Sequence, residues 1–204
     1  VNRDIFLRTL CLVTVTLFFT SAGASQGEII LAVNTLLMQL FTLFSYVMDG
    51  FAYAGEALSG RYIGARNRKA FTNTTRHLFI WGGWLAAFFT LVYALGGNAF
   101  LGLLTDNKDV VSAAGTYFYW ALAIPVAGIA AFIWDGIFIG ATATRGMLAS
   151  MAIAAISFFV VYYGLRPVLG NHALWLAFLV YLAMRGVVQT LLSPKIIKEN
   201  FTQP

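Results

Sequence analysis

The stretch Tyr46–Lys69 reads YVMDGFAYAGEALSGRYIGARNRK, and it decides the fold. It overlaps the end of a largely apolar run, Ile29–Met48. Asp49 and Glu56 then lie seven residues apart, two helical turns, so both point to the same side of a helix. Four basic residues complete the stretch. An apolar helix with acids inside it and bases at its end predicts a membrane span that ends at a headgroup surface.

The composition of the whole chain supports a membrane protein. Of the 204 residues, 60% are hydrophobic and 10% are charged, whereas a soluble domain averages about 45–50% and about 25%. The surplus apolar surface must therefore face lipid. A single cysteine, Cys11, excludes an internal disulfide framework. The net charge of +5 comes without a basic stripe interleaved with aromatics, so we expect no nucleic-acid partner.

Six apolar segments are long enough to cross a bilayer core of ~30 Å, which needs about 20 helical residues. They are too continuous for the alternating strands of a barrel, and lipid admits only helices or closed barrels. The sequence predicts an all-α polytopic membrane protein, one six-helix transmembrane lobe over residues 1–204. The helices are expected at about 5–24, 29–65, 77–96, 113–143, 147–165 and 173–192.

The basic residues predict the orientation. With the N-terminus in the cytoplasm, eleven basic residues lie at or toward the inside and two lie outside, a strong positive-inside bias. The two outside are Lys108 and Arg166; the eleven are Arg3, Arg8, Arg61, Arg66, Arg68, Lys69, Arg76, Arg145, Arg185, Lys195 and Lys198. Both termini are therefore expected on the cytoplasmic side of a bacterial inner membrane. The start of the chain, with SAGAS at 21–25, also resembles a signal peptide, and cleavage would leave the same orientation.

Four charged residues interrupt the apolar segments and are the candidates for a cation or substrate pathway: Asp49, Glu56, Asp135 and Arg185. Ionisable groups at membrane depth rarely face lipid, because insertion costs about 2.5–3.5 kcal/mol even on the mildest scales. Spacing from the basic helix ends places Asp49, Asp135 and Arg185 at a similar depth, which predicts a buried cluster. Asp49 and Glu56 are also compatible with a helix end that projects into the cytoplasm, and Arg185 with a side chain that extends to the inner headgroups.

Glycines and a proline suggest how the helices pack. Gly60-x-x-x-Gly64 and Gly50-x-x-x-Ala54 are pairs of small residues that allow close helix approach, and Gly136 and Gly140 follow Asp135 in the same manner. Pro125 is expected to kink its helix and free a carbonyl group. Asn34 and Gln39 are expected to hydrogen-bond between helices.

No enzyme signature is visible in the sequence. His77 and His172 lack metal-ligand spacing, and neither a nucleophile elbow nor a phosphate loop is present. The prediction is a protein that is not an enzyme and uses no cofactor and no metal beyond a coupling ion.

Three stretches carry a resemblance to a known family. MDGFAYAGEALSGRYIGARNRKAF (48–71) and WDGIFIGATATRGM (134–147) resemble the eighth and tenth helices of multidrug and toxic compound extrusion (MATE) transporters of the DinF-like branch. GEIILAVNTLLMQLF (27–41) resembles the start of that eighth helix. The similarity runs over nearly the whole chain, and the two Asp-Gly motifs together are fairly specific.

The resemblance implies a secondary active antiporter that exports organic, often cationic xenobiotics in exchange for H⁺ or Na⁺ by alternating access. Such transporters have two six-helix lobes, and this chain corresponds to the second. The implied partners are the lipid bilayer, a small cationic substrate, and a missing N-terminal lobe or a second copy. An acidic residue on the tenth helix contributes to the cation or substrate site, which maps onto Asp135, with Asp49 at the acidic position of the eighth helix. The alternative is a non-transporting scaffold or assembly subunit whose buried charges only fix helix register.

Overall fold

The computed structural model describes residues 2–201, except for the side chain of Asn98, and this part of the chain is entirely helical apart from short turns. The helices are α1 (Asn2–Ala24), α2 (Glu28–Gly64), α3 (Arg68–Leu104), α4 (Lys108–Gly140), α5 (Thr144–Leu169) and α6 (Asn171–Phe201). All six are long and apolar enough to cross a membrane. The predicted fold class, all-α with six membrane-spanning helices, is confirmed.

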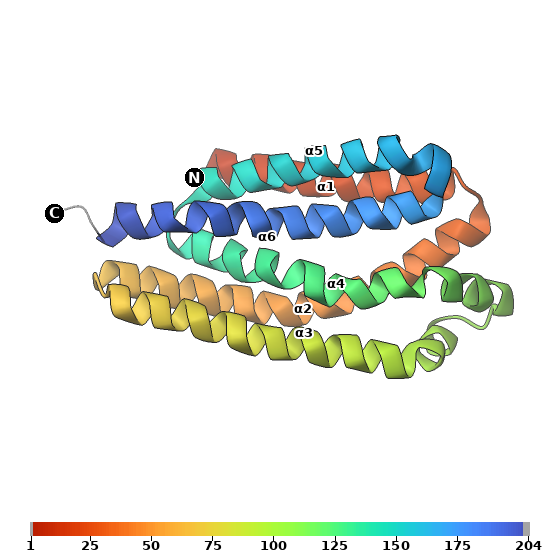
Figure 1. Ribbon diagram of the computed structural model, residues 1–204, viewed down its shortest axis with the longest axis horizontal. Helices are drawn as coiled ribbons and strands as arrows, with labels where there is room; N and C mark the ends of the chain where they lie inside the picture. Colours follow the sequence, from red (N-terminus) through yellow and green to blue (C-terminus); the bar gives the residue numbers. More distant parts are fainter. Residues whose placement is uncertain (1, 202–204) are drawn as a thin grey trace.

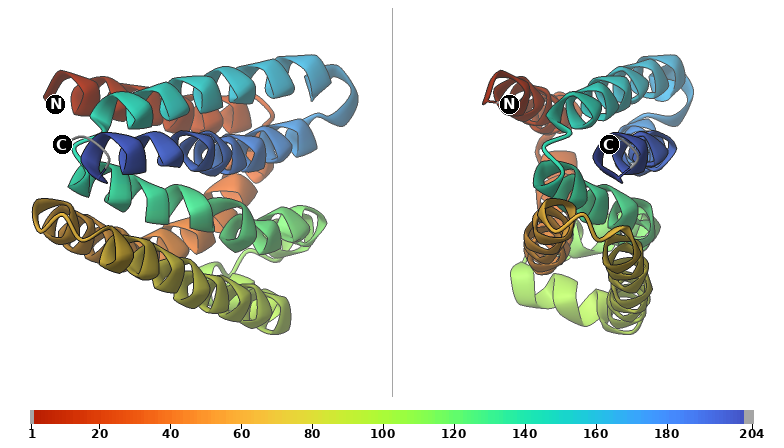
Figure 2. Two further views of the ribbon diagram at one scale, coloured as in Figure 1. Left: turned by 60° about the vertical axis from the view of Figure 1, so that its left-hand side comes forward. Right: turned by 90° about the vertical axis from the view of Figure 1, so that its left-hand side faces the viewer.

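The six helices run side by side, and successive helices point in opposite directions (Figure 1). The first and last helices begin and end at the same end of the bundle, here called the terminal end. The turns 65–67 and 141–143 also lie there. Helix α4 lies in the centre and packs against α2, α3 and α6, while α1 packs mainly on α5 at one side (Figure 2). Central α4 is accordingly the most completely buried helix.

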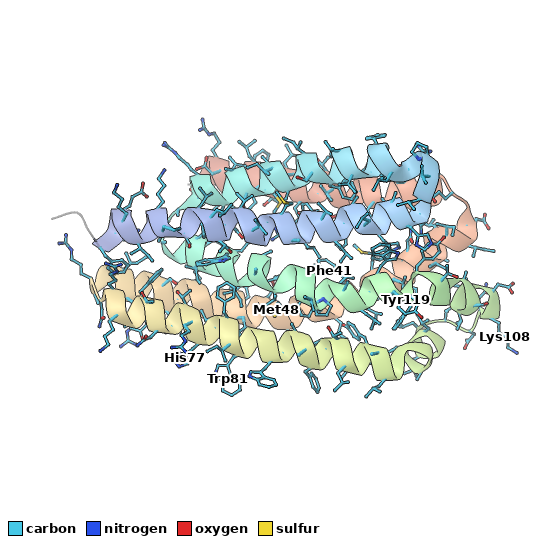
Figure 3. The ribbon with its side chains drawn as sticks, viewed as in Figure 1. Phe41, Met48, His77, Trp81, Lys108 and Tyr119 are labelled. Carbon is cyan, nitrogen blue, oxygen red and sulfur yellow. The ribbon has the colours of Figure 1, made fainter. Side chains whose placement is uncertain are left out.

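The side chains show which helix faces lie inside the bundle and which lie on its surface (Figure 3). Met48 of α2 is fully buried between helices, whereas Trp81 projects outward from α3 with 64% of its surface exposed. Lys108 lies at the end opposite the terminal end. Of the eleven basic residues predicted inside, Arg8 and Arg185 instead lie within the bundle, so nine remain at or near the terminal end.

Several helices extend well beyond the predicted spans. Helix α3 begins at Arg68 rather than near 77, and α6 continues to Phe201 rather than ending near 192. Side-chain caps explain two of the helix starts: Asn67 accepts from the amide of Ala70, and Asn107 accepts from the amide of Asp109. Capping satisfies backbone donors outside the bilayer, so hydropathy marks the membrane-embedded part of a helix and not its full length.

The two turns at the terminal end have the same backbone geometry. After α2, the amide of Asn67 donates to the carbonyl of Tyr62; after α4, the amide of Ala143 donates to the carbonyl of Phe138. These bonds, five residues long, define Schellman motifs, in which the residue before the donor usually is a glycine with positive φ. Here those residues are Arg66 (φ 50°) and Thr142 (φ 53°). For a β-branched residue such as Thr142 this conformation is strained.

Helices α2 and α4 meet at backbone distance through two glycines of α4. A methyl group at Gly136 or Gly140 would overlap the backbone carbonyl of Ala52 or Glu56, respectively. Gly60 lies opposite, where a Cβ would be 3.4 Å from the carbonyl oxygen of Gly140. Gly50 and Gly64 are exposed, and no described atom lies within 4 Å of the position of a Cβ on either. The small-residue strip therefore brings α2 and α4 together through Gly136, Gly140 and Gly60, but not through Gly50 or Gly64.

Pro125 lies buried within α4, which remains one helix from Lys108 to Gly140. Because proline has no N–H group, the carbonyl of Ala121 loses its helical donor. In the same turn, the hydroxyl of Thr90 on α3 donates to the carbonyl of Leu122 at 3.3 Å. A neighbouring helix thus supplies a donor where the proline weakens the helical hydrogen bonds.

A polar contact fastens the opposite end of the bundle. The amides of Asn34 on α2 and Asn171 on α6 donate to each other's oxygens at 2.8 and 2.9 Å, and the indole of Trp175 also donates to Asn34, at 2.9 Å. The prediction that Asn34 hydrogen-bonds between helices is confirmed. The side chain of Gln39 is exposed, and no interhelical bond is found for it among the described residues.

Candidate functional site

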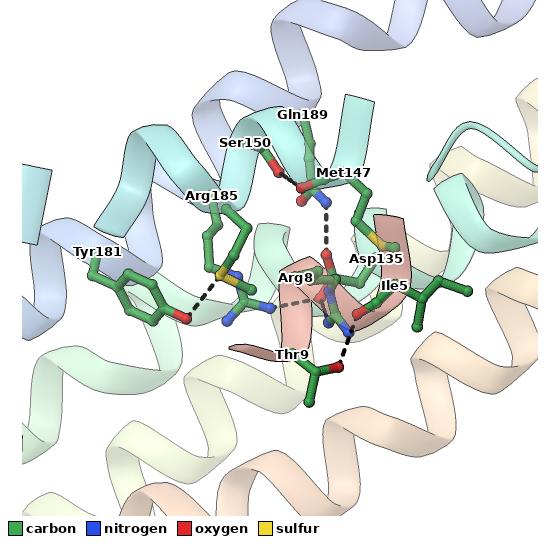
Figure 4. A network of polar contacts seen from close by, with 10 residues as sticks. Ile5, Arg8, Thr9, Asp135, Met147, Ser150, Tyr181, Arg185 and Gln189 are labelled. Atoms are coloured by element: carbon green, nitrogen blue, oxygen red, sulfur yellow. Dashed lines mark hydrogen bonds and ion pairs between the residues drawn. The ribbon is translucent and has the colours of Figure 1, made fainter. Parts of the chain in front are cut away.

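The candidate site is built around Asp135, in the buried second half of α4. Its Oδ2 accepts hydrogen bonds from Arg185 at 2.6 Å and from Arg8 at 2.5 Å, and its Oδ1 accepts from Gln189 at 2.6 Å (Figure 4). Only 6% of Asp135 is exposed, and the exposures of Arg185 and Gln189 are 4% and 0%. We call these four residues the Asp135 cluster. It joins α1, α4 and α6 at one point.

Local helix geometry explains how α6 supplies two of the partners. Arg185 and Gln189 are four residues apart, so they lie one above the other on the same face of α6. Next to Arg185, Gly186 allows α6 to approach α4 closely: a Cβ there would be 2.7 Å from that of Ala130. The guanidinium of Arg185 also lies 5.5 Å from the ring centre of Tyr181 and 5.9 Å from that of Phe132. These rings add cation–π attraction to the ion pair.

The Asp135 cluster contains more positive than negative charge, because two guanidinium groups share one carboxylate. Charge-assisted hydrogen bonds of this length are strong, and a buried charge without its partner is costly. Three buried polar atoms of the cluster have no protein hydrogen-bond partner in the described chain: Nε of Arg8, Nε of Arg185 and Oε1 of Gln189. The cluster therefore retains unused donor and acceptor capacity.

Asp49 lies near the cluster but does not join it by a hydrogen bond. The charges of Arg8 and Asp135 act on its carboxylate, which places Asp49 within electrostatic range of both. Asp49 is only partly buried, and its carboxylate forms no hydrogen bond or ion pair with the described side chains.

Glu56, the second predicted acid of α2, lies apart from the cluster. Its backbone carbonyl packs against Gly140, and its side chain is partly buried without a hydrogen bond or ion pair to a described residue. Of the four predicted charged candidates, the structure brings Asp135 and Arg185 into contact, places Asp49 beside them and leaves Glu56 outside. Arg185 is buried in an ion pair and does not extend to the headgroups.

Arg8 and Gln189 were not among the predicted site residues. The sequence holds a signal for Gln189, which is polar and lies one helical turn from Arg185. Arg8 looked like one more basic residue near the start of the chain. Its side chain is instead 19% exposed and reaches Asp135 from α1. Because Arg8 donates a hydrogen bond to Asp135, α1 is an integral part of the bundle.

Helix α2 presents an exposed strip that combines tyrosines with polar and small residues. Tyr46 and Tyr53 are 72% and 69% exposed, with Gly50 between them on the same face. The strip contains Thr35, Gln39, Leu43, Tyr46, Gly50, Tyr53 and Ala57, and we call it the α2 strip. In the middle of α3 the exposed face is apolar and contains Trp81, Trp84, Phe88, Leu91 and Leu95. Asp49 is adjacent to Gly50, so it lies at the edge of the α2 strip.

Six membrane-length helices around a buried ion-pair network define an integral membrane protein of the polytopic α-helical class. The family model described as MatE matches residues 5–168. The chain belongs to the MatE family, which confirms the resemblance found in the sequence.

Two curated relatives resemble this chain over most of its length. The DNA damage-inducible protein F of Escherichia coli K12 is 44% identical over 186 residues, which cover 91% of this chain and 40% of that protein. Protein DETOXIFICATION 42 of Arabidopsis thaliana is 24% identical over 188 residues, 90% of this chain and 36% of that protein. The chain thus spans less than half the length of the curated relatives it matches.

Proposed function

We propose that this chain is one lobe of a secondary active exporter that moves organic cations across a bacterial inner membrane in exchange for H⁺ or Na⁺. Membership of the MatE family and the name of the Arabidopsis relative, a detoxification protein, support a transport role. The exchange of a small cation for an organic one needs a carboxylate that both can reach. The position of Asp49 is the observation that carries this proposal.

Asp49 combines three properties that such an exchange requires. It lies at the edge of the exposed α2 strip. Its carboxylate forms no hydrogen bond or ion pair with a described side chain, and the positive charge of Arg8 acts on it. The tyrosines of the α2 strip offer aromatic faces on which an organic cation can stack. In this proposal the α2 strip lines the water-filled transport cleft, because intramembrane polar surface is stable only against protein or water.

Asp135 and Asp49 have different roles in this proposal. A cation that binds Asp135 must first displace a guanidinium from a carboxylate oxygen, since both oxygens already accept hydrogen bonds. Asp49 needs no such displacement. We assign the exchange to Asp49, and to Asp135 the task of holding Arg8 and Arg185 so that α1 and α6 keep their places around it. This refines the expectation that Asp135 itself exchanges the cation.

The α2 strip also suggests where the rest of the transporter lies. A polar, glycine-containing strip fits a surface that faces a second lobe across a cleft better than one that faces lipid. The relatives are more than twice as long as this chain, which leaves room for that second lobe. A second copy of the chain is the alternative occupant. The excess of basic residues at the terminal end supports a cytoplasmic location of this end of the bundle.

Efflux of a fluorescent organic cation from vesicles tests this function, with the chain produced together with its companion lobe. Asp49→Asn is expected to reduce efflux at least tenfold, while the protein reaches the membrane in normal amount. Asp106→Asn, at an exposed carboxylate in the turn between α3 and α4, is the matched control and is expected to leave efflux unchanged. If neither the unsubstituted protein nor the control drives efflux under an H⁺ or Na⁺ gradient, the scaffold alternative replaces this proposal.

A further inference from the structure

A cavity of about 550 Å³ opens at the terminal end of the bundle, between the start of α1, the turn 141–143, the start of α5 and the end of α6. Its lining is mixed. Asp4, Thr144, Arg145 and Glu199 supply polar groups, and Phe138 and Leu192 supply part of the apolar surface. Asp4 is unusual here because it is 94% buried, with a relative exposure of 6%, although it lies near the start of the chain.

The cavity leads toward the Asp135 cluster. Three of its lining residues stand one helical turn from cluster members: Asp4 is four residues before Arg8, Phe138 is three after Asp135, and Leu192 is three after Gln189. One turn of helix rises about 5 Å. Since α1, α4 and α6 all contribute to both sites, the cavity and the cluster are stacked, with a single layer of side chains between them.

That layer contains an aromatic ring and one hydrogen bond. Phe138 is 1% exposed, and its ring occupies space that Gly146 leaves free: a Cβ at 146 would lie 2.8 Å from the ring. The hydroxyl of Thr144 donates to Asp4 at 3.0 Å and links α5 to α1 beside the ring. Two charged pairs lie at the cavity: Nε of Arg3 is 3.9 Å from Asp4, and the exposed Lys195 and Glu199 pair with each other at 3.7 Å.

The Asp135 cluster holds three buried polar atoms that have no hydrogen-bond partner among the described residues: Nε of Arg8, Nε of Arg185 and Oε1 of Gln189. Buried polar atoms without a protein partner are usually satisfied by water. We therefore expect water at the cluster. Water must reach it from somewhere, and this cavity is separated from it by one side-chain layer.

We propose that the cavity is the aqueous entrance through which water reaches the Asp135 cluster from the terminal end, and through which the small coupling cation passes the cluster on its way to Asp49. Phe138 closes the entrance, and Asp4 is the buried carboxylate that the entering cation meets. The use of this route by a coupling ion rests on the transport function proposed above. The accessibility of the cavity to water does not, so the two can fail separately.

Cysteine accessibility tests the entrance without any transport assay. In a Cys11→Ser background, Leu192→Cys places a thiol in the cavity, and Leu191→Cys places one on the neighbouring face of α6, where the side chain is 74% exposed outside the cavity. A charged, membrane-impermeant methanethiosulfonate is applied to membrane vesicles of either orientation. We expect Leu192→Cys to react at least tenfold faster than Leu191→Cys, and only from the side that carries the termini. Equal rates, or reaction from the opposite side, would overturn the proposal.

A second reporter tests the closure by Phe138. Ser150 is 1% exposed on α5 and lies near Gln189 and Met147, and cysteine is nearly isosteric with serine (Figure 4). We expect Ser150→Cys to react slowly, and Phe138→Leu to accelerate its reaction at least tenfold from the terminal side. An unchanged rate in the Phe138→Leu variant contradicts the closure. If the thiols behave as expected but cation efflux is absent, the entrance stands and the proposed transport function fails.

Discussion

Replacing Asp135 by asparagine is the perturbation whose effect the structure defines best. The side chain keeps its shape but loses its charge, which leaves Arg185 almost fully buried and Arg8 mostly buried without a carboxylate. Removing one partner of a buried ion pair costs about 3–5 kcal/mol. Arg185→Gln is expected to cost less, about 1.5–3 kcal/mol, because Asp135 then keeps Arg8 and Gln189 as donors.

The double variant Asp135→Asn/Arg185→Gln tests whether the two buried charges are energetically coupled. It removes both buried charges of the pair, so its cost is expected to fall short of the sum of the single variants by about 1–3 kcal/mol. The assay is equilibrium unfolding of the purified protein in mixed detergent micelles, followed by tryptophan fluorescence. The matched variant is Arg8→Gln: the Arg8 side chain is 19% exposed against 5% for Arg185, which predicts a smaller loss, about 1 kcal/mol. Additive effects of Asp135→Asn and Arg185→Gln would refute the account of a coupled cluster.

Three further predictions use the same unfolding assay. Gly136→Ala forces a methyl group against the carbonyl of Ala52 and is expected to lower the free energy of unfolding by about 1–3 kcal/mol. The control Gly64→Ala, where a Cβ has open space, is expected to be neutral or slightly stabilising. Equal losses would show that α2 and α4 are not in backbone contact. Asn34→Ala leaves the Asn171 amide and the Trp175 indole without their partner, for an expected loss of about 1–3 kcal/mol, and no loss would argue against this buried contact. Thr142→Gly relieves the left-handed conformation and is expected to raise stability by about 1 kcal/mol; a decrease would mean that the threonine conformation is not strained.

Much of the fold follows from the sequence because lipid leaves few choices. Apolar runs of sufficient length must be helices, and the spacing of Asp135 from Arg145 and of Asp49 from Arg61 gave the depth of both acids. Depth is independent of packing detail, so the similar level of Asp135 and Arg185, which the structure joins in an ion pair, was predictable.

The rotation and pairing of the helices were not predictable in the same way. Helix α1 carries apolar residues on every face, so no periodic pattern indicated that Arg8 would point inward to Asp135. The glycines were equally ambiguous: Gly136 and Gly50 occur in similar motifs, but only Gly136 faces another helix of this chain. The exposure of Gly50 is understood once the α2 strip is assigned to a cleft rather than to a helix contact.

Equilibrium binding of a fluorescent organic cation to the purified protein with its companion lobe tests the central claim most directly. The claim is that Asp49, and not Asp135, holds the cation. Asp49→Asn is expected to raise the Kd at least tenfold, about 1.4 kcal/mol. Asp135→Asn, studied at a temperature where it remains folded, is expected to change the Kd by less than about threefold. The opposite ranking, with binding lost in Asp135→Asn and kept in Asp49→Asn, would contradict the account.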